Sequence, residues 1–228
     1  MLSKRFDEEL ILQKATEMGL ITENVEPIFD GTFDDKLYYQ TQIGWLLREP
    51  YDDEENGMPC GGGWSIPHDC FEKDDAWKQP TWKPIIYTMF GVLNNIHYDD
   101  MDDISPDNGM VDVLKHILYL NLSKMPGYHS SSLSELWDKY QIWKDVVKQQ
   151  IEHYQPKIVI CAGTFDYIKD DLAEDAVPIK EFPFGYEKGI YKTKDRYYIA
   201  TYHPIQRSIK RELYVDSIID AVNYIHSL

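Results

Sequence analysis

The sequence predicts an α/β fold of three layers, in which helices cover both faces of a central, mainly parallel, four-stranded sheet. Two observations support this prediction. Four apolar runs have the length and residue types of buried strands, and helical patterns lie between and around them. Strands that alternate with helices are typical of parallel sheets, because two parallel strands need a long connection that a helix can supply.

The four predicted strands are rich in β-branched, aliphatic and aromatic residues. They cover residues 42–47, 117–122, 157–162 and 197–202. Continuous apolar runs of this kind indicate strands that are buried on both faces. Residues 189–197 predict a hairpin that leads into the last strand and adds an antiparallel edge to the sheet.

The predicted helices follow from apolar residues spaced three and four apart. Such patterns cover residues 4–18 and 84–97, and a final helix follows the last strand. The clearest pattern begins after Ser130–Ser132, which can supply an N-cap, and it places seven apolar side chains on one face. These are Leu133, Leu136, Tyr140, Trp143, Val147, Ile151 and Tyr154.

The chain of 228 residues predicts a single domain, residues 1–228, with residues 1–40 as an N-terminal helical extension. It contains no polar linker long enough to separate two domains. No window approaches 18 uncharged apolar residues, and the first residues lack the apolar stretch of a signal peptide. We therefore expect a cytoplasmic monomer that does not associate with a membrane.

The charge of the chain limits the partners that it attracts. The net charge is −16, of which residues 1–110 contribute −15 and residues 111–228 contribute −1. A protein this acidic gains nothing from a general attraction to phosphate, so any contact with DNA requires a local basic patch. The candidates for that patch are Lys124, Arg207, Lys210 and Arg211.

Polar and glycine-rich residues follow the predicted strands. In open α/β sheets, ligands bind beyond the carboxyl ends of the strands. Glu49 follows the first strand, Asn121 lies near the end of the second, and His203 follows the fourth. The run Gly61–Gly63, which allows a close approach of backbone to a ligand, precedes Trp64. We expect Glu49, Trp64, Asn121 and His203 to line one cleft.

These residues resemble the uracil-DNA glycosylase superfamily over about residues 40–225. Glu49-Pro50-Tyr51 stands where the family has an acidic or amide residue, often within an Asp-Pro-Tyr sequence. Asn121 is similar to the asparagine with which the family reads the uracil edge, and His203-Pro204 stands where the family has His-Pro-Ser. The chain departs from the family pattern at Leu47-Arg48, which stands in place of a glycine, and at Ile205, which replaces the serine.

The resemblance implies a hydrolase of base excision repair that cleaves the N-glycosidic bond of a flipped uracil or other deaminated base in DNA. In that interpretation His203 donates to the departing base anion, and Glu49 orients or deprotonates the attacking water, with Asp52 as the alternative for this role. The implied substrate-binding residues are Tyr51, which closes the pocket, Trp64 or Phe71, which stacks on the base, and Asn121.

Two alternatives remain open at this point. The first is a catalytically inactive module on the same fold that binds a nucleotide or a protein, which the acidic charge and Ile205 favour. The second is a zinc site at Cys60, His68 and Cys70, although no fourth ligand stands nearby. Three cysteines cannot supply the four ligands of an iron–sulfur cluster. We therefore predict no cofactor and no metal.

Overall fold

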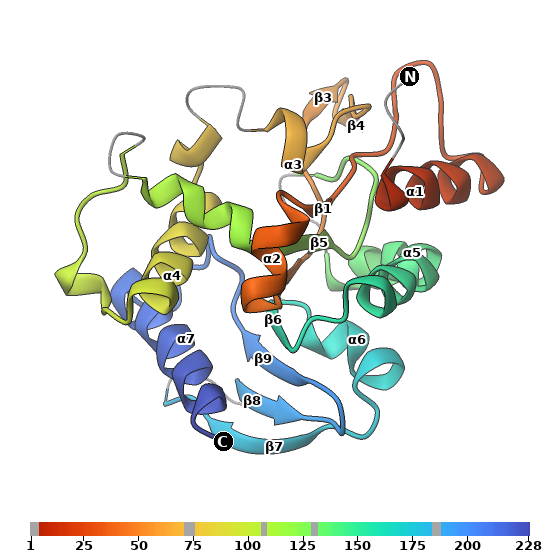
Figure 1. Ribbon diagram of the computed structural model, residues 1–228. Helices are drawn as coiled ribbons and strands as arrows, with labels where there is room; N and C mark the ends of the chain where they lie inside the picture. Colours follow the sequence, from red (N-terminus) through yellow and green to blue (C-terminus); the bar gives the residue numbers. More distant parts are fainter. Residues whose placement is uncertain (1–4, 71–75, 106–108, 129–131, 184–187) are drawn as a thin grey trace.

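The computed structural model describes residues 5–70, 76–105, 109–128, 132–183 and 188–228 (Figure 1). It has an α/β architecture with a mixed central sheet of seven strands. Helices α4 (Trp82–Asn94) and α7 (Arg211–His226) cover one face of the sheet, and α5 (Leu133–Tyr154) and α6 (Phe165–Leu172) cover the other (Figure 1). Among the described helices, none combines the length and the apolar character that crossing a membrane requires.

The sheet is larger than the four-stranded sheet that the sequence predicts. Its strand order is β1-β5-β2-β6-β9-β8-β7. The four apolar runs form the central strands, and each of these pairs in parallel with its neighbour in the order β5, β2, β6, β9. The strands are β1 (Gly31–Thr32), β2 (Ile43–Leu47), β5 (Ile117–Asn121), β6 (Ile158–Ala162), β7 (Val177–Glu181), β8 (Gly189–Lys192) and β9 (Tyr197–Thr201).

The three additional strands are antiparallel and have no apolar run of their own. Strand β1 has only two residues, and it pairs with β5 at one edge. Strand β7 forms the other edge, and it is mostly exposed and contains Pro178. The predicted hairpin is present as β8 and β9, but β7 lies outside it. A separate small hairpin consists of β3 (Asp53–Glu55) and β4 (Met58–Cys60).

The remaining helical elements are short, except for the N-terminal helix α1 (Phe6–Glu17), which packs against α5. They are the α-helices α2 (Asp35–Thr41) and α3 (Ile66–Asp69) and the 3-10 helices η1 (Ala76–Lys78), η2 (Tyr98–Asp100) and η4 (Met110–His116). Residues 1–40 thus contain a strand of the sheet as well as helices.

The long helix α5 shows how local sequence sets an element boundary. The Ser132 hydroxyl accepts from the Glu135 N–H, and the Glu135 carboxylate accepts from the Ser132 N–H, which forms a reciprocal capping box. The helix ends at Tyr154, because the left-handed backbone of the C-cap residue Gln155 stops further helical hydrogen bonding. The described cap therefore agrees with the serine run that the sequence analysis identified.

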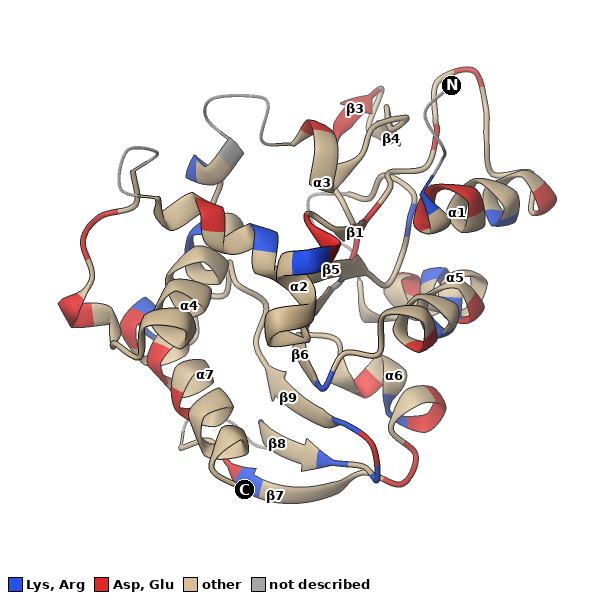
Figure 2. Cartoon of the chain, viewed as in Figure 1, with Lys and Arg blue, Asp and Glu red and all other residues tan. Residues whose placement is uncertain are grey.

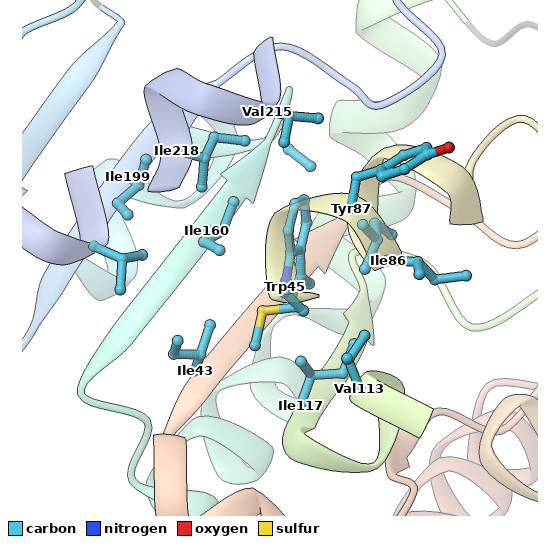
Figure 3. Packing of buried hydrophobic residues seen from close by; sticks show 14 of the residues in the cluster. Ile43, Trp45, Ile86, Tyr87, Val113, Ile117, Ile160, Ile199, Val215 and Ile218 are labelled. Atoms are coloured by element: carbon cyan, nitrogen blue, oxygen red, sulfur yellow. The ribbon is translucent and has the colours of Figure 1, made fainter. Parts of the chain in front are cut away.

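Two apolar clusters lie on the two faces of the sheet. On the face of α4 and α7, Trp45, Ile160 and Ile199 pack with Ile86 and Ile218 (Figure 3). The opposite face packs against α5 and α6. Each buried aliphatic side chain of this kind contributes roughly 1.5–3 kcal/mol through the area that it removes from water. This packing fixes the sheet and hence the edge at which the polar residues gather.

Candidate active site

The carboxyl ends of the parallel strands form one edge of the sheet. Across this edge, Asn121 is opposite Leu47, and Ala162 is opposite Thr201. Arg48 and Glu49 follow β2 directly, Gly163 follows β6, and His203 follows β9 two residues after its end. Neighbouring strands lie about 4.8 Å apart, so about 14 Å separates the backbones of β5 and β9. The predicted residues therefore share an edge but occupy its two ends.

A cavity of about 550 Å³ opens at the β6 and β9 end of this edge. Among the sequence-predicted residues, His203 lines it, whereas Glu49, Trp64 and Asn121 do not. The lining consists of Arg48, Leu133, Ser134, Trp137, Gly163, Thr164, Phe165, Asp166, Tyr167, Lys188, Thr201, Tyr202 and His203. The size falls within the range of small-molecule sites in proteins.

His203 is a neutral imidazole in this cavity. Burial, with a smaller contribution from the positive charge of Arg48, lowers the pKa of His203 from 6.5 to about 4. The Ile205 N–H donates to Nδ1 of His203 at 3.4 Å. Because Nδ1 accepts this bond, the proton of the neutral ring is on Nε2. His203 therefore offers an N–H donor without carrying a charge at pH 7.

Arg48 is the residue of this edge that sequence reasoning missed as a site residue. Its Nε is buried and has no hydrogen-bond partner among the described residues. Its guanidinium lies against Gly163, where a Cβ would be 3.4 Å from both Nε and Nη2. Gly163 also has a φ of +72°, which other residues rarely adopt. The glycine thus allows the guanidinium to reach the cavity.

Asn121 is sealed from solvent at the end of β5. It is 1% exposed, and neither atom of its side-chain amide has a hydrogen-bond partner within the described parts of the chain. Its backbone N–H donates to Oδ2 of Asp30 at 2.7 Å. Buried amides without partners cost free energy, so such groups often mark a site that a ligand completes.

A buried polar cluster holds the segment beside Asn121. The Lys124 ammonium donates to Oδ2 of Asp30 at 2.6 Å, and both side chains are completely buried. Gln150 donates to Asp30 at 2.9 Å and to Asp7 at 2.8 Å, and the Tyr154 hydroxyl also donates to Asp7. Lys124 is therefore not available to DNA phosphates, which corrects the prediction from the sequence.

The predicted catalytic carboxylate of Glu49 is held by an ion pair. Nζ of Lys139, on α5, lies 2.5 Å from Oε2 of Glu49, whose side chain is 8% exposed. The loop residue Gly127 packs so closely that a Cβ there would contact the Glu49 carboxylate. The pair fixes the carboxylate at the edge of the sheet, between the ends of β5 and β6.

Asp52, the alternative to Glu49, supports the glycine loop. Its Oδ2 accepts from the Gly62 N–H at 2.7 Å and from Nε1 of Trp64 at 2.9 Å. Trp64 is half-buried and packs against the larger apolar cluster. These contacts give Asp52 a structural role, and they give the Gly61–Gly63 run a fixed conformation.

The other predicted substrate and DNA contacts lie further out. Tyr51 is 42% exposed and is not part of the cavity lining. Phe71 lies outside the described residues. Arg207, Lys210 and Arg211 are exposed, at the end of a loop that the Gln206 side chain ties together by bonds to the backbone of Ser208 and Ile209. All three cations are accessible to a ligand at the surface.

The surface charge is uneven, as the composition indicates. Acidic residues mark the β3–β4 hairpin, α1 and the region of η2 (Figure 2). In the described part of the chain, no three His, Cys, Asp or Glu side chains are grouped so as to hold a metal ion. The residues Cys60, His68 and Cys70 thus do not form the zinc site considered above.

Comparison with models of known protein families and with curated proteins finds no match to this chain.

Two features of the sequence could have pointed to the cavity. Arg48 directly follows an apolar strand, at the position where ligand-contacting residues gather. Trp137 is a large aromatic residue outside the apolar stripe of α5, and it is 40% exposed. Lys188 gives no such signal, because a lysine next to a strand is ordinary.

Proposed function

We propose that the chain is a uracil-DNA glycosylase-like hydrolase that cleaves the N-glycosidic bond of a flipped uracil or other deaminated base in DNA. The observation that carries the proposal is the set Glu49, Asn121 and His203, which occurs at one edge of the parallel strands. The order of these residues along the chain is the order in the family that the sequence resembles. Each has the chemistry that the reaction needs.

Asn121 would read the base. An amide offers one donor and one acceptor side by side, which matches the alternating polar edge of uracil. The unpartnered state of this amide supports the role, because a bound base would satisfy both atoms. Solvent does not reach the amide, so a neighbouring segment has to move before a base can enter.

His203 would stabilise the leaving base. As the bond to the sugar breaks, negative charge develops on the base, and a preorganised N–H donor stabilises that charge. The lowered pKa of His203 and the bond from Ile205 to Nδ1 leave the proton on Nε2, so the imidazole can donate without being protonated. The cation of Arg48 beside it adds favourable charge.

Glu49 would position the attacking water. A carboxylate accepts a hydrogen bond from water and favours positive charge on the sugar in the transition state. The ion pair with Lys139 keeps the Glu49 carboxylate oriented, although it also uses one oxygen.

The test is single-turnover cleavage of oligonucleotides that contain uracil, hypoxanthine or xanthine, in single and double strands, read as abasic sites. Loss of a preorganised donor typically lowers the rate about 10² to 10³-fold, so His203→Ala should do so. Asn121→Ala should lower the rate further and weaken discrimination of uracil from cytosine. Glu49→Gln keeps the shape but removes the charge.

The control is Lys194→Gln, a substitution at an exposed residue in the turn between β8 and β9. It should leave the rate unchanged. If the wild-type protein forms no abasic sites, or if the three site variants stay within about threefold of it, the proposal fails.

The second candidate is a binding module on this fold. The sealed amide of Asn121 and the occupied carboxylate of Glu49 favour it. Binding to a uracil-containing strand without formation of abasic sites would support the module over the enzyme.

A further inference from the structure

We infer that the cavity at the ends of β6 and β9 binds a phosphate group together with the nucleobase attached to the same nucleotide. The inference does not depend on bond cleavage, because it concerns recognition by residues outside the set Glu49, Asn121 and His203. The source of the phosphate is either a free mononucleotide or a nucleotide within a single strand.

The first step is the charge of the cavity. Arg48 and Lys188 contribute two cations to its lining, and Asp166 contributes one exposed carboxylate. The positive balance is notable in a protein with a net charge of −16, because the surrounding field opposes it. The field of the whole protein repels an extended polyanion more strongly than a compact anion, so the cavity can attract a single phosphate group despite the net charge.

The second step is the unsatisfied hydrogen-bonding capacity of the lining. Arg48 has a buried Nε without a hydrogen-bond partner among the described residues. Thr201 is 2% exposed and borders the same cavity. An arginine presents several N–H donors in a planar fork that matches the oxygens of phosphate. A phosphate on Arg48 would supply the acceptors that the protein does not.

The third step is the aromatic wall. Trp137 is 40% exposed, and its ring lies 6.1 Å from that of Tyr167, which also lines the cavity. A base can stack on an exposed indole, which contributes about 1–3 kcal/mol in nucleic-acid complexes. The two cations and the indole therefore line the same cavity.

Lys188 completes the arrangement. Its Nζ lies 5.6 Å from the centre of the Tyr202 ring, and both residues line the cavity. The contact orders a long side chain that would otherwise be mobile. A cation held in this way meets a phosphate at a lower entropic cost.

The experiment is isothermal titration calorimetry of the full chain at low salt with dUMP, dAMP, deoxyuridine, inorganic phosphate and a short single-stranded oligo-dT. We expect dUMP or dAMP to bind at least tenfold more tightly than deoxyuridine and than phosphate alone. Tighter binding of the oligonucleotide than of the mononucleotides identifies a strand as the source, and the reverse identifies a free nucleotide.

The variants separate the two parts of the site. Arg48→Gln should lower nucleotide affinity at least tenfold, and Arg48→Lys should lower it less. Trp137→Leu should lower nucleotide affinity at least threefold, whereas Trp137→Phe should keep most of the wild-type affinity. Lys194→Gln is the matched control and should bind as the wild type does. Circular dichroism shows whether each variant is folded.

The inference is wrong if neither mononucleotides nor the oligonucleotide bind, or if Arg48→Gln and Trp137→Leu bind them as the wild type does. These outcomes are separate from the test of cleavage. A protein that binds dUMP through Arg48 but forms no abasic sites would retain this site and lose the proposed enzyme. Cleavage by the wild type, together with nucleotide binding that Arg48→Gln and Trp137→Leu leave unchanged, would retain the enzyme and lose this site.

Discussion

Asp7 should make the stability of the protein depend on pH in a direction opposite to that of most carboxylates. Burial is the main cause that raises the pKa of Asp7 from 3.8 to about 6, and hydrogen bonds from Tyr154 and Gln150 oppose it. The folded protein therefore binds a proton at Asp7 more tightly than the unfolded chain does. The contribution to stability is fully present below about pH 4 and is lost as the pH rises through about 6.

The magnitude follows from the two pKa values. The full shift corresponds to about 3 kcal/mol, and about 1.4 kcal/mol of it falls between pH 5 and pH 7.5. Asp30, Lys124 and Tyr154 face Asp7 in the same buried cluster. Burial lowers the pKa of the Lys124 ammonium, but the charge of Asp30 opposes the shift.

The perturbation is Asp7→Asn, which keeps an acceptor for Gln150 or Tyr154 and removes the titration. Urea unfolding at pH 5 and pH 7.5 gives the free energy of unfolding at each pH. Between pH 5 and pH 7.5, the free energy of unfolding of the wild type should fall by about 1.4 kcal/mol more than that of the variant. The matched control is Glu9→Gln on the exposed side of the same helix. An identical pH dependence in the Asp7→Asn and wild-type proteins would refute the reasoning.

The remaining predictions concern stability. Lys124→Met should lower the free energy of unfolding by about 3–5 kcal/mol, because it leaves the buried Asp30 carboxylate unpaired, and urea unfolding measures the loss. Gly62→Ala should lower the melting temperature more than Gly57→Ala, since both glycines have a positive φ but only the Cβ at Gly62 would meet backbone, the carbonyl of Glu26; equal shifts would contradict this. Ser132→Ala should cost about 1 kcal/mol through loss of the cap.

The central part of the fold was predictable because its signals are local. The central strands consist of continuous apolar runs, because strands buried on both faces need apolar side chains on both. These strands are β2, β5, β6 and β9. The edge strands β1 and β7 carry no such signal. Strand β1 has two residues, and β7 is exposed on most of its length, so pairing geometry rather than residue type defines them.

The site was predictable only in part, because its environment depends on contacts between distant segments. Asp30 and Lys124 are 94 residues apart in the chain, and no local pattern predicts their ion pair. Lysine is among the residues that are least often buried, so Lys124 appeared to be a surface cation. Asp52 likewise appeared in the sequence as a candidate catalytic carboxylate, although its hydrogen bonds to the glycine loop explain its position.

The buried cluster also links the N-terminal helix to the edge of the sheet where Asn121 lies. Asp7 on α1 and Asp30 before β1 share the Gln150 side chain of α5, and Asp30 accepts the backbone N–H of Asn121. A change at Asp7 therefore has a path of three hydrogen bonds to the backbone of the proposed base-reading residue. A buried polar group that loses its partner lowers the free energy of unfolding. The hydrogen bonds of this cluster therefore fix the positions of its segments relative to one another. The polar cluster, as much as the apolar core, sets the position of Asn121.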